Sequence, residues 1–354
     1  MIDAYSIPVT KIERSKLNDT PLENIPFGKL FTDHMLVADY INGEWTNVEI
    51  KPYQNLSVAP SLAAIHYGQA IFEGIKAYRN AAGEAFIFRP YDNWSRFNIS
   101  AKRMQMPEVP EEIFIEGMRQ LISLDKKWIP DYADHSLYIR PFMFSTDEVI
   151  GVKASDTYKF MIILSPTGPY YSTPARIYVE ETYTRAAPGG IGFVKAAGNY
   201  GASMLVTAEA RKQGYDQVLW TDSAEHKYAQ EIGTMNVFFV TGNTVLTPDL
   251  EQGTILNGVT RSSAITIMKE MGYKVEEREV SIEEMIGLYK KGQLQEVFGT
   301  GTAATITPIR ELKYKDFVMT FNVDEWKAAP EMKRRLTDIR EGRAADNHGW
   351  LFKV

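Results

Sequence analysis

Apolar and polar residues alternate in short runs along this chain of 354 residues, and the runs predict several β-strands. Residues 136–144 (SLYIRPFMF) and 160–166 (FMIILSP) are rich in apolar side chains and predict strands. Two alternating runs on either side of residues 81–83 predict a β-hairpin. A second hairpin is predicted over 235–248, with Gly242 at its turn.

Helical patterns occur between these strands. Residues 111–127 follow Pro110 and place four apolar side chains on one stripe, namely Phe114, Met118, Leu121 and Ile122. Further helices are predicted near 93–104, from Ser203 to Gly214, from Asn257 to Gly272, from Ser281 to Gly292 and near 331–341. Strands and helices mix without strict alternation, which favours an α+β fold of about two domains.

Composition removes several classes of function. Lys and Arg total 39 against 45 Asp and Glu, and no basic run is present, so we expect no nucleic acid partner. The absence of cysteine excludes disulfides and thiolate chemistry, and the five dispersed histidines form no metal-binding motif, so no metal is expected. The sequence contains neither a membrane-length apolar run nor a signal peptide, and we expect a cytoplasmic protein with no membrane partner.

Lys195 is the first candidate for chemistry. It lies in GFVKAAGN, with small apolar neighbours between two groups of glycines. Partial desolvation would favour the neutral amine, which attacks carbonyl groups. Because most lysines are simply solvated surface residues, this sequence context alone does not distinguish a Schiff-base lysine from an ordinary one.

Two glycine-rich turns could bind anions. Residues 257–260 (NGVT) open a helix, and its N-terminus suits a phosphate, although Thr260 could equally be a plain helix cap. Residues 299–304 (GTGTAA) match the GxGxxA pattern of dinucleotide-binding folds. The following ITPIREL contains Pro308 and is a poor helix, so we disfavour a nicotinamide site and retain a nest of backbone N–H groups.

Three charged residues lie in apolar surroundings. Glu231, in YAQEIGTMN, could pair with a protonated pyridine nitrogen or could be a surface residue at a strand end. Arg140 has the same strand parity as Tyr138 and could bind a carboxylate or form an internal salt bridge. Arg96, on a predicted helix, has the same two interpretations.

Taken together, these segments resemble the fold-type IV aminotransferases that depend on pyridoxal 5'-phosphate, and among them the branched-chain amino acid aminotransferases. The resemblance covers roughly residues 60–345. The matching strings are HYGQAIFEGIKAYR (66–79), NWSRFNISAKRM (93–104), SLYIRPFMF (136–144), SPTGPYY (165–171), VKAAGNYGAS (194–203), QVLWTD (217–222), QEIGTMNVFF (230–239), NGVTR (257–261), VFGTGTAA (297–304) and KRRLTDIREG (333–342).

The resemblance implies a role for each matching residue. For the cofactor, it implies a Schiff base at Lys195, the ring oxygen bonded by Tyr200, the pyridine nitrogen paired with Glu231, and the phosphate held by Arg96, Val259, Thr260 and Thr302. For the substrate, it implies α-carboxylate contacts from Tyr138, Thr302 and Ala303, an apolar pocket at Phe72, and contributions from Tyr67 and the loop Ile150–Val152 of a neighbouring subunit.

The resemblance also implies a two-domain fold and a homodimer or higher homo-oligomer. We expect a smaller α/β two-layer sandwich over 1–171, an interdomain segment over 172–187, and a larger α/β pseudo-barrel over 188–354 that carries Lys195. The expected reaction moves the amino group of leucine, isoleucine or valine to 2-oxoglutarate. Arg140, at the rim of an apolar pocket, would bind the acidic side chain of 2-oxoglutarate.

Several alternatives stay open. D-amino acid aminotransferases, aminodeoxychorismate lyases and amine transaminases share the fold, and a non-catalytic pyridoxal phosphate or anion-binding protein would keep the same turns. YIRPF and EIGTMN favour the branched-chain group. Some members carry a CxxC pair after the GTA turn, but here Ala304 and Thr307 occupy those places, so regulation by that thiol pair is not expected.

Overall fold

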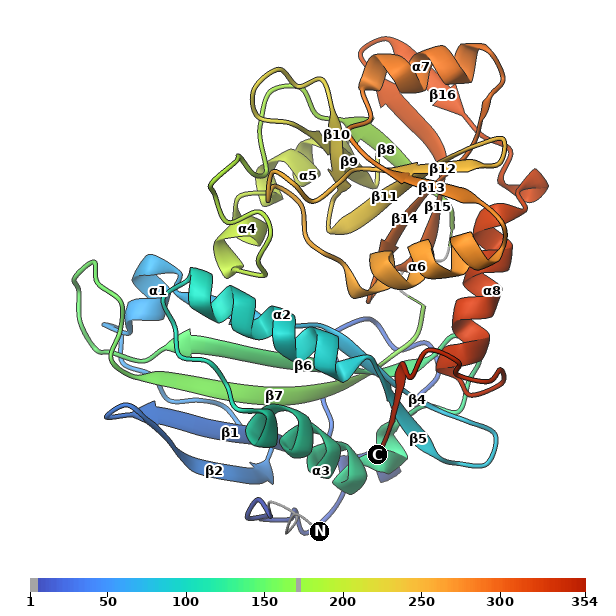
Figure 1. Ribbon diagram of the computed structural model, residues 1–354. Coiled ribbons are helices and arrows are strands. Elements are labelled where there is room, and N and C mark those ends of the chain that lie inside the picture. Colours follow the sequence, from blue (N-terminus) through green and yellow to red (C-terminus); the bar gives the residue numbers. More distant parts are fainter. Residues whose placement is uncertain (1–5, 170–172) are drawn as a thin grey trace. The chain divides into compact units, whose positions relative to one another are not determined.

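The computed structural model describes residues 6–169 and 173–354, and the chain forms two compact units (Figure 1). Unit 1 comprises Met1–Tyr170, Val194–Ala197 and Arg340–Val354, and unit 2 comprises Tyr171–Phe193 and Gly198–Ile339. The expected division differs in three respects: the N-terminal unit is the longer one, the segment around Lys195 belongs to it, and so does the C-terminal segment. The predicted interdomain segment 172–187 belongs to unit 2, and its first residue, Ser172, lies outside the described residues.

Unit 1 is built on an antiparallel sheet with the strand order β17-β5-β4-β6-β7-β1-β2, to which β3 adds by pairing with β6. Its elements are η1 Lys16–Asp19, β1 His34–Ile41, β2 Glu44–Pro52, α1 Ala63–Tyr67, β3 Ala70–Phe72, β4 Ile75–Arg79, β5 Ala85–Phe88, α2 Pro90–Arg103, the π-helical η2 Glu112–Glu116, α3 Gly117–Leu124, η3 Lys126–Trp128, β6 Ser136–Ser145, β7 Tyr158–Thr167 and β17 Leu351–Lys353.

One face of this sheet forms the main core of unit 1. Strand alternation directs Leu137, Ile139 and Met143 of β6 into it, together with residues of β4, β5 and β7. The helices α2 and α3 cover this face (Figure 1), and the predicted stripe of α3 and its π-helical approach is fully buried there. The other face of the sheet therefore receives the alternate side chains, among them Tyr138 and Arg140.

Backbone pairing explains why two late segments belong to unit 1. The strand β17 adds to the edge of the sheet beside β5, with Leu351 opposite Phe88. The segment around Lys195 pairs with β3: the amide of Phe72 donates to the carbonyl of Lys195 over 3.1 Å, and Ile71 forms an antiparallel bridge with Ala196. Neither pairing connects residues that are close in sequence, so no local pattern predicts it.

Unit 2 contains a barrel-like sheet, because the path β10-β9-β8-β15-β14-β11 is closed by a pairing between β10 and β11. The strands β12 and β13 extend from β11, and β16 pairs with β15. Its elements are β8 Ala175–Val179, α4 Ala197–Gly201, α5 Met204–Lys212, β9 Gln217–Thr221, β10 Ala229–Ile232, β11 Met235–Thr241, β12 Thr244–Thr247, α6 Val259–Glu270, β13 Lys274–Glu277, α7 Ile282–Lys290, β14 Leu294–Gly301, β15 Thr305–Tyr314, β16 Phe317–Thr320, η4 Val323–Glu325 and α8 Ala328–Arg340.

The elements of unit 2 follow the predicted pattern closely. Both β-hairpins are confirmed, since β4 pairs with β5 in unit 1 and β11 with β12 in unit 2. The side chain of Ser281 caps α7 by accepting from the amide of Glu284, whereas the Glu284 carboxylate pairs with Arg278 instead of completing a capping box. The segment after the GTGTAA turn is the strand β15, which confirms that this turn does not open the helix of a dinucleotide fold.

The helix α8 begins three residues before its predicted start at 331. The buried carboxylate of Glu296, on β14, accepts hydrogen bonds of 2.7 to 2.8 Å from the amides of Lys327, Ala328 and Ala329. A carboxylate at a helix N-terminus satisfies donors that lack an intrahelical partner. Because this cap comes from a distant strand, the sequence near residue 328 does not reveal it.

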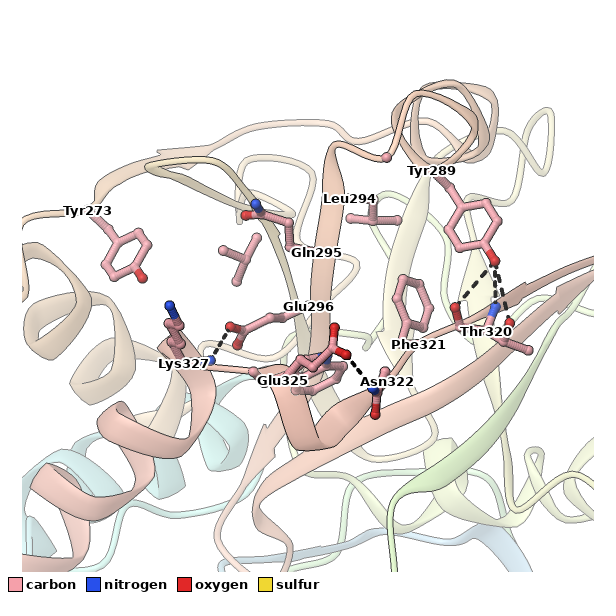
Figure 2. A pocket seen from close by; sticks show the side chains of 13 residues that line it. Tyr273, Tyr289, Leu294, Gln295, Glu296, Thr320, Phe321, Asn322, Glu325 and Lys327 are labelled. Atoms are coloured by element: carbon pink, nitrogen blue, oxygen red, sulfur yellow. Dashed lines mark hydrogen bonds between the residues drawn. The ribbon is translucent and has the colours of Figure 1, made fainter.

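A surface pocket of about 450 Å³ surrounds this cap (Figure 2). Its walls include the aromatic side chains of Tyr273, Tyr289, Phe321 and Trp326, and none of the predicted site residues lines it. Among the described residues, no helix combines the length and the apolar character needed to cross a bilayer.

Candidate active site

Lys195 is held in place by its backbone. Its amide donates to the hydroxyl of Ser100 over 3.2 Å, and that hydroxyl donates to the carbonyl of Arg96 on α2. Its carbonyl accepts from the amide of Phe72, as described above. The ammonium nitrogen of Lys195 lies 5.0 Å from the centre of the Phe72 ring, and the side chain is half-buried. This position agrees with the predicted partial desolvation.

Unit 1 brings three more of the predicted residues to the same place. The guanidinium of Arg140 lies 4.5 Å from the centre of the Phe72 ring, and its Nη2 donates a 2.8 Å hydrogen bond to the Tyr138 hydroxyl. The Nε of Arg140 is buried and has no hydrogen-bond partner among residues 6–169 and 173–354. A buried guanidinium nitrogen without a partner is costly, so this site is suited to an anionic ligand.

Tyr138 lies against Gly74, which follows β3. A Cβ added to Gly74 would lie 2.3 Å from the Tyr138 hydroxyl oxygen, so only glycine leaves room for this phenol. The ring of Phe27 packs edge-on against Tyr138 at a centroid distance of 4.9 Å. The hydroxyl position of Tyr138 is therefore set by close packing on one side and by Arg140 on the other.

Arg96 forms a buried internal ion pair, which was one of its two interpretations from the sequence. Its Nε and Nη2 donate to the two carboxylate oxygens of Glu73 over 2.7 and 2.8 Å, and Nη2 also lies 3.3 Å from the Oδ1 of Asn93. The carboxylate of Glu73 is completely buried. Such a bidentate pair fixes the guanidinium plane and orients its remaining donors.

Glu231, in unit 2, is buried, so the alternative of a surface residue at a strand end is wrong. One carboxylate oxygen accepts from the amide of Leu256 over 2.7 Å and from Asn236 over 3.2 Å, and the other lies 3.2 Å from Nη2 of Arg185. A buried carboxylate is stabilised by such charge-assisted partners.

Asn236 links Glu231 to the N-terminus of α6. A Cβ at the helix-capping residue Gly258 would lie 2.1 Å from the Asn236 Oδ1, so the cap requires glycine. The cap has no side chain to occupy the first turn, where Val259 and Thr260 are buried. A helix of 12 residues directs its positive end to this point.

The remaining predicted residues have less constrained positions. Thr302 and Ala303 lie in the turn between β14 and β15, half-buried, and Tyr200 lies half-buried in α4. Tyr67 and Val152 are exposed, to 39% and 89%. Unit 1 thus brings together Lys195 with three of the predicted substrate residues, and unit 2 connects Glu231 to the start of α6.

Comparison with known proteins identifies the family of this chain. The family model described as amino-transferase class IV matches residues 70–312, which is more than half of the chain. The chain belongs to this family of transferases, as the resemblance predicted, and its α+β fold is the fold of solved members.

Its relatives narrow the assignment to the branched-chain group. A probable branched-chain-amino-acid aminotransferase of Staphylococcus epidermidis is 47% identical over 349 residues, which cover 97% of each chain. Branched-chain-amino-acid transaminase 1 of Bacillus subtilis is 45% identical, with 94% of each chain covered. The solved branched-chain aminotransferase of Thermoproteus uzoniensis has 25% identity and a TM-score of 0.74, with 90% of this chain and 99% of that chain covered. The enzyme class predicted from the sequence is therefore confirmed.

Sequence reasoning missed three residues that hold the predicted ones in place. Glu73 pairs with Arg96, Arg185 pairs with Glu231, and Asn236 contacts both Glu231 and the carbonyl of Leu256. An acid within the apolar run IFEGI was a usable signal for Glu73. Arg185 had none, because its ion-pair partner Glu231 lies 46 residues further along the chain.

The close approach of Gly74 to Tyr138 gives a first prediction. We expect Gly74→Ala to displace the phenol and break its bond to Arg140, with a loss of about 1–3 kcal/mol in the free energy of unfolding. Urea unfolding and a crystal structure of the variant measure both effects. Gly287→Ala is the matched control, because no atom lies within 4 Å of a Cβ added there. An unchanged Tyr138 hydroxyl position in Gly74→Ala would contradict the packing argument.

Proposed function

We propose that this protein transfers the amino group of L-leucine, L-isoleucine or L-valine reversibly to 2-oxoglutarate, with pyridoxal 5'-phosphate as the cofactor. The observation that carries the proposal is the group formed by Lys195, Phe72, Tyr138 and Arg140. It combines an amine, an apolar ring and two anion-binding donors on one surface of unit 1. An amino acid that is apolar at one end and anionic at the other requires these properties.

The residues present suit the cofactor. The glycine-capped start of α6, with the buried hydroxyl of Thr260, provides donors for a phosphate. Glu231, which forms an ion pair with Arg185 and accepts from backbone and amide donors, suits a protonated pyridine nitrogen. Relatives support this fit, since the branched-chain aminotransferase of T.th. is known in a crystal with pyridoxamine 5'-phosphate. When bound, pyridoxal phosphate supplies the electron sink that stabilises a carbanion at the substrate Cα.

The chain's own residues then have distinct tasks. Lys195 would hold the cofactor through its side-chain amine, and the free amine would accept the proton from the substrate Cα and return it to the cofactor C4′ carbon. Glu231 would keep the pyridine nitrogen of the cofactor protonated, and Tyr200 would donate to the ring oxygen. The residues that would hold the phosphate are Arg96, Val259, Thr260 and Thr302. In this assignment the Glu73 carboxylate orients Arg96 without contacting the cofactor.

Substrate binding uses the other half of the predicted residues. The α-carboxylate accepts from Tyr138 and from the amides of Thr302 and Ala303, while Phe72 contacts the apolar side chain. Arg140 binds the second carboxylate of 2-oxoglutarate. Its buried Nε and its bond to Tyr138 support this role, since the guanidinium is already oriented before an acid arrives.

A covalent test addresses Lys195 directly. We expect borohydride reduction of the holoenzyme to fix the cofactor on the peptide that contains residue 195, as measured by peptide mass spectrometry. Lys195→Ala should show neither the fixed cofactor nor transamination above about a thousandth of the wild-type rate. Lys212→Ala, at an exposed lysine, is the control. Wild-type turnover in Lys195→Ala would refute the proposal, and a preference for D-alanine over L-leucine would reassign the substrate.

The role of Arg140 is tested by comparing two acceptors. We expect Arg140→Ala to lower kcat/KM for 2-oxoglutarate by about 30-fold or more, because a charge-assisted bond worth about 2–3 kcal/mol is lost. The loss with 4-methyl-2-oxopentanoate should stay below about fivefold, since that acid lacks the second carboxylate. The same steady-state kinetics are measured with Tyr138→Phe, which keeps the guanidinium of Arg140. This comparison separates the effect of the guanidinium from that of the Tyr138 hydroxyl. Equal losses with the two acceptors in Arg140→Ala would contradict this role.

We also propose that the active form is a homodimer in which each subunit completes the site of its partner. The loop that contains Ile150 and Val152 exposes these two apolar side chains to 72% and 89% in the single chain. Ile65 and Tyr67 of α1 are exposed to 62% and 39%. The loop and α1 are joined within unit 1 by the bridge between Leu62 and Glu148. Exposed apolar groups clustered in this way are typical of an interaction surface.

Subunit complementation tests this arrangement. We expect Val152→Asp and Lys195→Ala to be nearly inactive when separate, and a mixture refolded together to regain activity. Random pairing makes about half of the dimers mixed, each with one intact site, so the mixture should reach about a quarter of the wild-type activity. The control uses Val318→Asp in place of Val152→Asp. It introduces the same charge at another exposed valine and so measures the effect of a new surface charge alone. No recovery in the mixture would show that the loop serves its own subunit.

A further inference from the structure

Lys76 is a buried cation that lies next to Tyr138. The strands β4 and β6 place Lys76 directly opposite Tyr138 in an antiparallel pair, and the alternate residues Ile75 and Ala77 point into the core. Directly opposite residues share a face of the sheet and have Cβ atoms about 5 Å apart. Lys76 is only 7% exposed. The amine therefore shares the face that carries Tyr138 and Arg140.

Two charged groups of opposite sign, Arg340 and Asp134, act on Lys76. Arg340, 3% exposed, is hydrogen-bonded to the hydroxyl of Tyr78 on the same strand and lies 4.4 Å from the centre of the Phe88 ring. Asp134, exposed just before β6, is the acid that acts on Lys76. Burial and the charge of Arg340 lower the pKa of Lys76 to about 7, against the smaller opposite effect of Asp134.

Of the neighbouring strands, β6 adds Tyr138 and Arg140 to this face, and β7 adds Lys159, which lies opposite Phe144 and forms an ion pair with Asp39. On β17, Lys353 lies opposite Phe86 and forms an ion pair with Glu84. Phe86 and Phe88 of β5 flank Tyr78 and Lys76, and Ser165 of β7 lies opposite Tyr138. The hydroxyls of Ser165 and Ser136 are buried and lack a hydrogen-bond partner among the described residues. Buried hydroxyls without partners mark a place where a polar group is expected, as a ligand or a water molecule.

We propose that Lys76 is a positioning residue for acidic substrates, which takes up a proton when a carboxylate binds beside Tyr138 and Arg140. This inference rests on the proposed substrate site. A nearby anion favours the ammonium over the amine, and by thermodynamic reciprocity the protonated lysine favours the anion. A dicarboxylate such as 2-oxoglutarate brings one more negative charge to this face than a branched 2-oxo acid. The binding of 2-oxoglutarate therefore depends more strongly on the protonation of Lys76 than the binding of a branched 2-oxo acid does.

The direction of the pH effect follows. Below about pH 7 Lys76 is charged before the ligand arrives, and binding is strongest. As the pH rises above that value, the proton must be taken from solution, and affinity for a dicarboxylate falls by up to about tenfold for each pH unit. The preference for 2-oxoglutarate over branched 2-oxo acids should therefore decrease as the solution becomes alkaline.

The test uses the holoenzyme and two acids that cannot react, glutarate and 4-methylvalerate. Titration calorimetry from about pH 6 to about pH 9, in two buffers of different ionisation enthalpy, gives both the affinity and the protons taken up. We expect wild-type protein to take up as much as about one proton with glutarate near pH 8 and clearly less with 4-methylvalerate. Between about pH 6.5 and pH 8.5 the Kd for glutarate should rise by about tenfold or more, and that for 4-methylvalerate by less than about threefold.

Two substitutions of Lys76 remove the titrating amine in opposite ways. Lys76→Arg keeps the charge and should bind glutarate with an affinity that varies less than about twofold over this range. Lys76→Met removes the charge and should bind glutarate weakly at every pH, and neither variant should take up a proton. If one of the two variants fails to fold, which thermal unfolding detects, the other variant still tests the role of Lys76. Lys212→Met is the control at an exposed lysine.

The outcomes separate this inference from the proposed function. Proton uptake that persists in Lys76→Arg and Lys76→Met would overturn the role of Lys76 while leaving the substrate site intact. Equal proton uptake with the two acids in the wild-type protein would also overturn it. By contrast, an unchanged affinity for glutarate in both Arg140→Ala and Tyr138→Phe would show that the substrate site itself is wrongly placed.

Discussion

The site in unit 1 depends on the alternation of side chains along β6. Leu137, Ile139 and Met143 are buried in the core beneath α2 and α3, and this burial leaves no choice for the residues between them. Tyr138 and Arg140 must point to the other face. A shift of the strand by one residue would put a guanidinium into an apolar core and a leucine among the anion-binding groups. The hydrophobic energy of one face thus determines the chemistry of the other.

The same logic explains how a lysine from a late segment reaches this sheet. The segment around Lys195 contributes no strand of its own, yet its backbone pairs with β3 and its amide is held by Ser100. Fixing the backbone on both sides limits the lysine to its own rotamers. The flexible part is then the side chain alone, which suits an amine that must stay near one point while it moves a proton.

Much of this organisation could be predicted from the sequence, and the exceptions have a common cause. Strands such as β6 and helices such as α2 can be predicted from periodicity, because the order of apolar and polar residues within each segment matches its burial pattern. The candidate residues Lys195, Tyr138 and Arg140 could be named from the sequence, because each lies in an unusual local context of apolar or small residues. The limits of the two units were not, because they depend on pairings between distant segments. The early start of α8, capped by Glu296, is of the same kind.

Charge placement distinguishes the buried acids of the two units from the cations on the face that carries Tyr138. The buried acids Glu73 and Glu231 each have an arginine at 2.7 to 3.2 Å, so their charges are compensated within the protein. Arg140 differs, because no acid forms an ion pair with it among the residues that the structure describes, and its Nε has no partner there. Lys76 and Arg340 lie on the same sheet face, and burial lowers the pKa of both. A fold that accepts this cost on one surface is stabilised there by an anion, and the substrates of an aminotransferase are anions.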